Sequence, residues 1–292
     1  MTSKENPKFF MDRLRRAPLL VTFGAILLYF FILAAPSLLS STSFGGDVSK
    51  TPQSLPKNQL PLEIGLATSA LFIVFLLGWG RDARVTSKPS WSGFWYAVPP
   101  AAITLLILGI GVATASLQGI DATLLLTSEL VMATLLLVIF VGVFEETLFR
   151  GIVLHGLEIR FGPIIALLGS SVLFGSMHYV NWVGGQDLLS THQQVIHAAL
   201  SGVLYGAIAL RCRSIWPGVF LHSLWDFTVF VNGALGAGNP VQGDQVTTSE
   251  GFGAMVFLFL LRYFEPILGL IALLGWFRWS KKQNTTRSDN EY

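Results

Sequence analysis

Six ionisable side chains lie within otherwise apolar stretches of the sequence, in three clusters. They are Glu145, Glu146, Arg150, His178, His222 and Asp226. Carboxylates and histidines that meet in one cleft can remove a proton from water and direct the water at a carbonyl carbon, while the remaining hydrogen-bond donors stabilise the oxyanion that forms. The residue types therefore indicate a site that activates water against a carbonyl group.

Helical spacing predicts how the clusters are organised. Residues four positions apart share one face of a helix, so Glu146 can pair with Arg150, and His222 with Asp226. Glu145 is turned by about 100° from Glu146, which leaves the two carboxylates free for different roles. A single pair of this kind is more often structural, but three clusters at a similar depth favour a functional site.

A turn is expected between the first and second clusters. Gly162, which is followed by proline, is predicted to end one helix and begin the next. Glu145 lies 17 residues before Gly162 and His178 lies 16 residues after it. At 1.5 Å per residue both are then roughly 25 Å from the turn, and His222 and Asp226 are roughly 12–20 Å from their own turn. We therefore expect the hairpin to bring the first two clusters level, and a moderate tilt or offset of the third helix to close the remaining gap.

The chain as a whole has the composition of a membrane protein. Its 292 residues include 19 Lys and Arg and 17 Asp and Glu, so 12% are charged, compared with roughly 25% in a soluble domain. Hydrophobic residues make up 52% and the mean hydropathy is +0.60. We therefore expect the protein to be embedded in a lipid bilayer. No basic stripe supports binding to nucleic acid, and a lone cysteine, Cys212, excludes an internal disulfide.

Eight apolar segments predict an all-α polytopic membrane protein with about eight transmembrane helices. The segments are 18–39, 60–80, 94–116, 122–144, 163–180, 193–210, 214–232 and 251–277. The first exceeds the roughly 7–15 apolar residues of a signal peptide, so we interpret it as an anchor. Lys and Arg concentrate in alternate connections, which predicts that both termini are cytosolic. We expect the protein in the plasma membrane.

We expect a single integral membrane domain over 1–292. Stretches at 36–62 and 233–250, rich in polar residues, Gly and Pro, are predicted to be non-cytosolic loops, and 280–292 is predicted to be a disordered tail.

Several further residues are interpreted as structural. Arg262 and Glu265 are expected to neutralise each other as an i,i+3 pair inside the last apolar segment. Gly202 and Gly206 form a GxxxG pattern that predicts close helix packing. Three histidines are expected to lie outside the site because they are near turns or isolated: His155, His192 and His197.

Three motifs, in this order, resemble those of a known family. They are Glu145-Glu146-x-x-x-Arg150, Phe174-x-x-x-His178 and His222-x-x-x-Asp226, the last preceded by Arg211-Cys-Arg-Ser-Ile-Trp-Pro. Over roughly 140–232 the chain resembles the CPBP (CAAX protease and bacteriocin-processing, or Abi) family of intramembrane endopeptidases. The resemblance implies a CAAX-protease-like helical core, about 122–232 here, with a cytosol-facing cavity and a peptide or membrane protein as substrate.

The resemblance also implies catalytic roles. Glu145 and His178 are then the residues that activate water, while His222 and the residue at position 226 form the oxyanion-stabilising side. The second glutamate and the arginine of the first motif serve as support. The family commonly has asparagine at the last motif position, where this chain has Asp226. An ionised aspartate cannot donate a hydrogen bond to an oxyanion, so this difference bears on the mechanism.

Other interpretations remain open at the level of sequence. Two histidines and a glutamate could bind zinc. The sequence lacks the helical His-x-x-x-His pair that zinc proteases use, so we favour catalysis without a cofactor. The competing class is a transporter that uses the polar residues as a proton or ion pathway, which the lack of an internal repeat disfavours. A catalytically silent membrane scaffold is a further alternative, against which Glu145, His178 and His222 argue.

Overall fold

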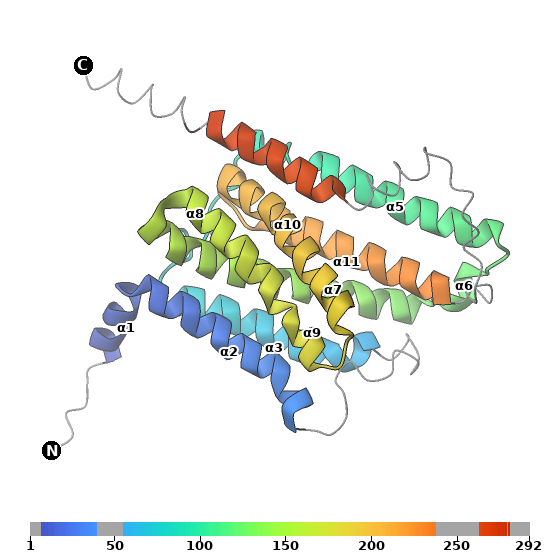
Figure 1. Cartoon of the computed structure of the whole chain (residues 1–292), viewed down its shortest axis with the longest axis horizontal. Helices are drawn as coiled ribbons and strands as arrows, with labels where there is room; N and C mark the ends of the chain where they lie inside the picture. Colours follow the sequence, from blue (N-terminus) through green and yellow to red (C-terminus); the bar gives the residue numbers. More distant parts are fainter. Residues whose placement is uncertain (1–6, 40–54, 238–262, 279, 281–292) are drawn as a thin grey trace.

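The computed structural model describes residues 7–39, 55–237, 263–278 and 280, and these residues form helices and short connections without a strand. In chain order the helices are α1 (Pro7–Arg15), α2 (Pro18–Leu39), α3 (Leu55–Leu76), α4 (Trp91–Phe94), α5 (Val98–Leu117), α6 (Ala122–Leu125), α7 (Ser128–Glu146), the π-helix η1 (Thr147–Val153), α8 (Leu154–Met177), α9 (Tyr179–Val183), α10 (Leu188–Cys212) and α11 (Trp216–Ala237). A further helix covers 263–278 (Figure 1).

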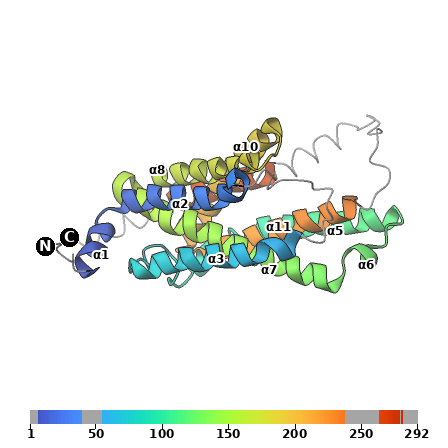
Figure 2. The same cartoon turned by 90° about the horizontal axis from the view of Figure 1, so that it is seen from below.

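The long helices form two layers (Figure 2). One layer contains α2, α8 and α10, and the other contains α3, α5, α7 and α11. Within the layers α10 packs on α8, α3 and α11 pack on α7, and α5 packs on α11. The π-helix η1 connects α7 in one layer with α8 in the other, so the residues around it lie between the layers.

Five stretches among the described residues are long and apolar enough to cross a membrane. They are Pro18–Leu38, Asn58–Leu76, Val98–Leu117, Ser128–Val183 and Leu188–Cys212. In the first three only 17–22% of the residues are buried, compared with 50% and 67% in the last two. The outer helices thus present apolar side chains at the surface, where lipid can cover them. This confirms the predicted all-α polytopic membrane protein.

The helix boundaries refine the predicted segments. Both ends of the expected loop at 36–62 are helical, because α2 continues to Leu39 and α3 begins at Leu55, and residues 40–54 lie outside the described part of the chain. The predicted helix 122–144 is divided, because Thr127 caps α7 by accepting a hydrogen bond from the Leu130 amide at 3.3 Å. The predicted helix 251–277 is helical from residue 263 on. The structure does not describe residues 251–262, most of the predicted loop 233–250, or residues 281–292 of the predicted tail. The expected eight membrane crossings and the cytosolic location of both termini therefore stay predictions.

The predicted hairpin between the first two clusters is confirmed. Within α8, Gly162 adopts φ 76° and ψ 170°, which breaks the helix before Pro163 and reverses the chain. The Ser170 hydroxyl consequently donates a hydrogen bond of 2.7 Å to the carbonyl oxygen of Phe149. A continuous helix would separate these two residues by roughly 30 Å. The turn therefore returns the second cluster to the level of the first.

Close packing of α10 on α8 is also confirmed at the GxxxG pattern. A Cβ atom at Gly202 would lie 3.0 Å from the Cα of Ser171, and one at Gly206 would lie 3.3 Å from Cγ of Leu167. The two glycines thus allow α10 to approach the returning arm of α8 closely, which places the second cluster beside α10.

Candidate active site

His222 on α11 is the centre of the candidate site. Its Nδ1 atom lies 3.1 Å from Oε1 of Glu146. On the other side of the ring, Nε2 lies 3.4 Å from Oε2 of Glu145 and 3.7 Å from Oδ2 of Asp226. His222 is 6% exposed, so water screens these charges weakly. The structure therefore brings together Glu145, Glu146, His222 and Asp226 from two helices.

The predicted pair of Glu146 and Arg150 is confirmed. Oε1 of Glu146 accepts a hydrogen bond of 2.9 Å from Nη1 of Arg150, and both side chains are fully buried. The guanidinium group also lies 4.2 Å from the ring centre of Phe174 and 5.2 Å from that of Tyr205. Burial of an ion pair is costly unless further contacts offset it. Here the two rings contact the guanidinium group, and Nδ1 of His222 lies 3.1 Å from Oε1 of Glu146.

The partner on each side of His222 determines the role of each ring nitrogen. Glu146 is paired with Arg150, so its carboxylate accepts and Nδ1 of His222 is assigned as the donor. The ring of Tyr205 stacks on His222 at 5.5 Å with an interplanar angle of 11°. Nε2 is therefore held toward Glu145 and Asp226. The sequence predicted Glu146 as support, but its contact with His222 was not predicted.

His178 lies near the same cluster without touching its carboxylates among the described contacts. Its Nδ1 atom is 3.1 Å from the carbonyl oxygen of Phe174, so Nδ1 is assigned as the donor and Nε2 as the acceptor. The Phe174 ring packs edge-on against His178 at 5.3 Å and against His222 at 5.8 Å. His178 thus lies at the predicted level, and Phe174 lies between the two histidines.

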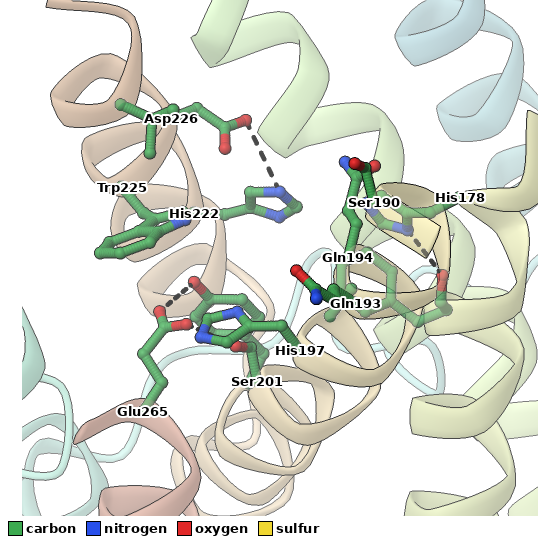
Figure 3. Close-up of a pocket in the computed structure, with 14 residues that line it drawn as sticks. His178, Ser190, Gln193, Gln194, His197, Ser201, His222, Trp225, Asp226 and Glu265 are labelled. Carbon is green, nitrogen blue, oxygen red and sulfur yellow. Dashed lines mark hydrogen bonds and ion pairs between the residues drawn. The ribbon is translucent and has the colours of Figure 1, made fainter. Parts of the chain in front are cut away.

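A pocket of about 450 Å³ connects these residues, within the range of roughly 300–1,000 Å³ that small-molecule sites occupy. It is lined by Phe174, His178, Ser190, Gln193, Gln194, His197, Ala198, Ser201, Tyr205, His222, Trp225, Asp226, Val229 and Glu265 (Figure 3). Glu145 is not among the lining residues and reaches the site through its contact with Nε2 of His222. The pocket combines aromatic rings with polar groups, as a ligand site requires.

Two of the lining residues make contacts that the sequence did not predict. Glu265 accepts hydrogen bonds from the hydroxyls of Ser201 and Tyr205 on α10. Arg262 lies outside the described residues, so its expected pairing with Glu265 stays a prediction. His197 lines the pocket and stacks on Trp225 at 6.4 Å, although we expected it outside the site. Both are brought to the pocket by packing between segments distant in sequence, which spacing along one helix does not reveal.

The other expected bystanders lie away from the pocket. His155 packs edge-on against Trp79 at 4.8 Å, and His192 forms a hydrogen bond of 2.8 Å with the Tyr179 hydroxyl. Cys212 is buried and is not among the residues that line the pocket.

Glu63 on α3 is an acidic residue near the candidate site that the sequence did not single out. Its carboxylate is close enough to Glu145 and Asp226 to interact electrostatically with both. Its Oε2 atom is buried and has no hydrogen-bond partner within the described part of the chain. A signal was available, because Glu63 is the only ionisable residue in the predicted segment 60–80 and such residues mark sites by default.

The start of α10 is fixed by a cap outside the apolar span. Asp187 accepts hydrogen bonds from the Ser190 amide at 2.9 Å and from its hydroxyl at 3.1 Å. The backbone hydrogen bond, followed by the hydroxyl, lowers the pKa of Asp187, because both stabilise the carboxylate form. Ser190 is thereby held at the beginning of the pocket-lining face of α10.

In residues 7–39, 55–237 and 263–278 no group of three or more His, Cys, Asp or Glu side chains is arranged to hold a metal ion. The carboxylates instead contact the nitrogens of His222 directly.

We expect Glu265→Leu to destabilise the protein. The hydroxyls of Ser201 and Tyr205 are buried, and the change removes their acceptor, at a cost of about 1–3 kcal/mol for each unsatisfied group. Thermal unfolding of the purified protein in detergent measures the loss. Glu265→Gln is the matched control, because its amide oxygen still accepts. Equal melting temperatures for the leucine variant and the wild type would contradict the described contacts.

The fold and the site together define a class: an all-helical polytopic membrane protein with a buried cluster of carboxylates and histidine beside a polar pocket. Residues 127–228 match the family described as type II CAAX prenyl endopeptidase Rce1-like. This match confirms the resemblance to the CPBP family and indicates an integral membrane peptidase. The chain matches none of the curated proteins and none of the solved structures with which it was compared.

Proposed function

We propose that the chain is an intramembrane endopeptidase that hydrolyses a peptide bond with water activated by a glutamate and a histidine, without a metal ion. The observation that carries the proposal is the position of His222, whose Nδ1 atom contacts the paired Glu146 while Nε2 faces Glu145 and Asp226. A carboxylate base and a hydrogen-bond donor are thus side by side, next to a pocket that can hold a peptide.

In the proposed reaction Glu145 removes a proton from water as the oxygen attacks the scissile carbonyl carbon. His178, whose Nε2 atom is the free acceptor, positions the same water. The carbonyl oxygen becomes an oxyanion and is stabilised by protonated His222 and by Asp226. The tetrahedral intermediate then breaks its C–N bond, and Glu145 returns the proton to the leaving amine. Protonated His222 is supported by the carboxylate of Glu146, 3.1 Å from Nδ1, and by that of Glu145, 3.4 Å from Nε2.

The contact of Glu146 with Nδ1 bears on the role of Asp226. In a serine-protease triad an aspartate orients the histidine through the Nδ1 atom. Here Glu146 occupies that position, and Asp226 faces Nε2 instead. Glu146 therefore already makes the contact that orients His222, and Asp226 is not needed for it. We propose that Asp226 is protonated when the oxyanion forms and donates a hydrogen bond to it.

We expect Asp226→Asn to keep activity within about tenfold of wild type, because an amide also donates, whereas Asp226→Ala loses about 10²–10³, the scale of one oxyanion donor. Steady-state cleavage of a reporter peptide compares the two. If Asp226 instead orients His222 as an ionised carboxylate, Asp226→Asn loses about 10⁴. An asparagine variant as inactive as the alanine variant would therefore refute the donor role.

The peptidase proposal is tested by comparing protein termini in membranes that contain the wild type or Glu145→Gln. New termini that require Glu145 support the proposal and identify the substrate, which the family resemblance implies is a CAAX-type or other membrane-associated peptide. Identical termini contradict it. The transporter alternative predicts identical termini together with a proton or ion flux in vesicles that depends on Glu145.

A further inference from the structure

One face of α10 carries a row of polar side chains along the pocket. Ser190, Gln194, His197 and Ser201 follow one another at spacings of four, three and four residues, so they lie on one line of the helix. All four line the pocket, with Gln193 at the edge of the row. On the neighbouring face Ile196 and Leu200 are exposed. The polar row thus borders the pocket, and apolar side chains are exposed beside it.

Gln194 is held in a fixed orientation within this row. Its Oε1 atom accepts hydrogen bonds from Nδ2 of Asn181 at 3.0 Å and from Nε2 of Gln186 at 3.3 Å. These contacts use both lone pairs of the oxygen and assign the amide nitrogen as the group that remains available to donate. Figure 3 shows the Gln194 side chain between His178 and His222. Gln194 therefore lines the pocket with an amide nitrogen that remains available to donate.

An unwound peptide is the ligand that fits such a row. A peptide bond must leave its helix before water can attack it, and its backbone groups then lack partners in the apolar interior of a membrane. From Ser190 to Ser201 the row extends about 16 Å along the helix axis, which matches about five residues of extended chain. We propose that the row on α10 binds the unwound backbone of the substrate, and that Gln194 donates a hydrogen bond to one of its carbonyl oxygens.

The inference rests on the proposed peptidase function and is tested on the full-length protein. The probe is a synthetic peptide that spans a cleavage site lost in Glu145→Gln membranes. We expect Gln194→Met, which keeps the length of the side chain but removes its donor, to raise KM about fivefold and to leave kcat within about twofold of wild type. Such a change is typical of a contact made equally in ground state and transition state.

A second measurement separates direct contact from a structural role. One backbone carbonyl of the probe at a time is replaced by a thiocarbonyl, which is a weaker hydrogen-bond acceptor. In the wild type, one position is expected to raise KM about fivefold, and in Gln194→Met the same position is expected to have no effect. Ile196→Ala, which changes the exposed face of the same helix, is the matched control and is expected to keep the wild-type profile.

The outcomes distinguish the two proposals. If no terminus depends on Glu145, the peptidase function fails and the inference fails with it. If cleavage depends on Glu145 but every thiocarbonyl position affects wild type and Gln194→Met alike, the inference alone is wrong. Should Gln194→Met not accumulate in membranes, Asn181→Ala is used in its place. It frees the amide to rotate and is expected to weaken the position-specific effect, and an unchanged effect would overturn the inference.

Discussion

Replacing Glu145 with glutamine is expected to abolish peptide cleavage while the protein stays inserted and folded. Glu145 is the carboxylate next to Nε2 of His222, at 3.4 Å, and glutamine cannot take a proton from water. Loss of a general base costs about 10²–10⁴ in rate. Steady-state cleavage by the purified protein measures the loss. Because glutamine has nearly the same shape, we expect the melting temperature in detergent to change little.

Glu129→Gln is the matched control for this experiment. Glu129 is an exposed acidic residue in the first turn of the same helix, α7, whereas Glu145 is near its end. The control makes the same chemical change far from His222 and is expected to leave the rate unaltered. A well-folded Glu145→Gln protein that cleaves at the wild-type rate would remove Glu145 from the mechanism. In that case Glu63, which interacts with Glu145 and Asp226, is the next base to examine.

Replacing Arg150 with alanine is expected to destabilise the fold as well as to reduce activity. The change leaves the carboxylate of Glu146 buried without its cation, at a cost of about 3–5 kcal/mol. It also removes the guanidinium group from the rings of Phe174 and Tyr205. The melting temperature in detergent and the yield of protein from membranes measure the effect.

The double variant Glu146→Gln with Arg150→Gln separates charge from packing. It removes both buried charges and keeps side chains of similar length, so we expect it to recover much of the stability that Arg150→Ala loses. Its activity is expected to stay low, because Nδ1 of His222 loses its carboxylate partner. If the single and double variants melt at the same temperature, the charge of the pair does not determine the stability.

The parts of the structure that sequence predicted well are local. The pair of Glu146 with Arg150 follows from the period of one helix, and the reversal at Gly162 follows from a glycine beside a proline. The GxxxG pattern predicted the close approach of α10 because only the lack of a side chain at those positions permits it. Each of these inferences depends on residues that are at most a few positions apart.

The parts that sequence did not predict depend on packing between distant segments. Glu265 meets Ser201 and Tyr205 across more than 50 residues of chain, and His197 reaches Trp225 through the contact of α10 with α11. The π-helix η1 was also not predicted, since apolar periodicity distinguishes a π-turn from an α-turn poorly. All seven residues of η1 are buried, and π-turns of this kind occur frequently at functional sites.

The placement of Glu146 and Arg150 on one helical turn also bears on how the protein is made. Partners that lie four residues apart meet as soon as their own helix forms, before other helices are present. The two charges can therefore enter the bilayer during synthesis as a pair rather than as separate ions. His222 is 76 residues from Glu146 along the chain, so it joins the carboxylates only after α11 has been synthesised. The cluster around His222 is thus completed only after the pair of Glu146 and Arg150 has formed.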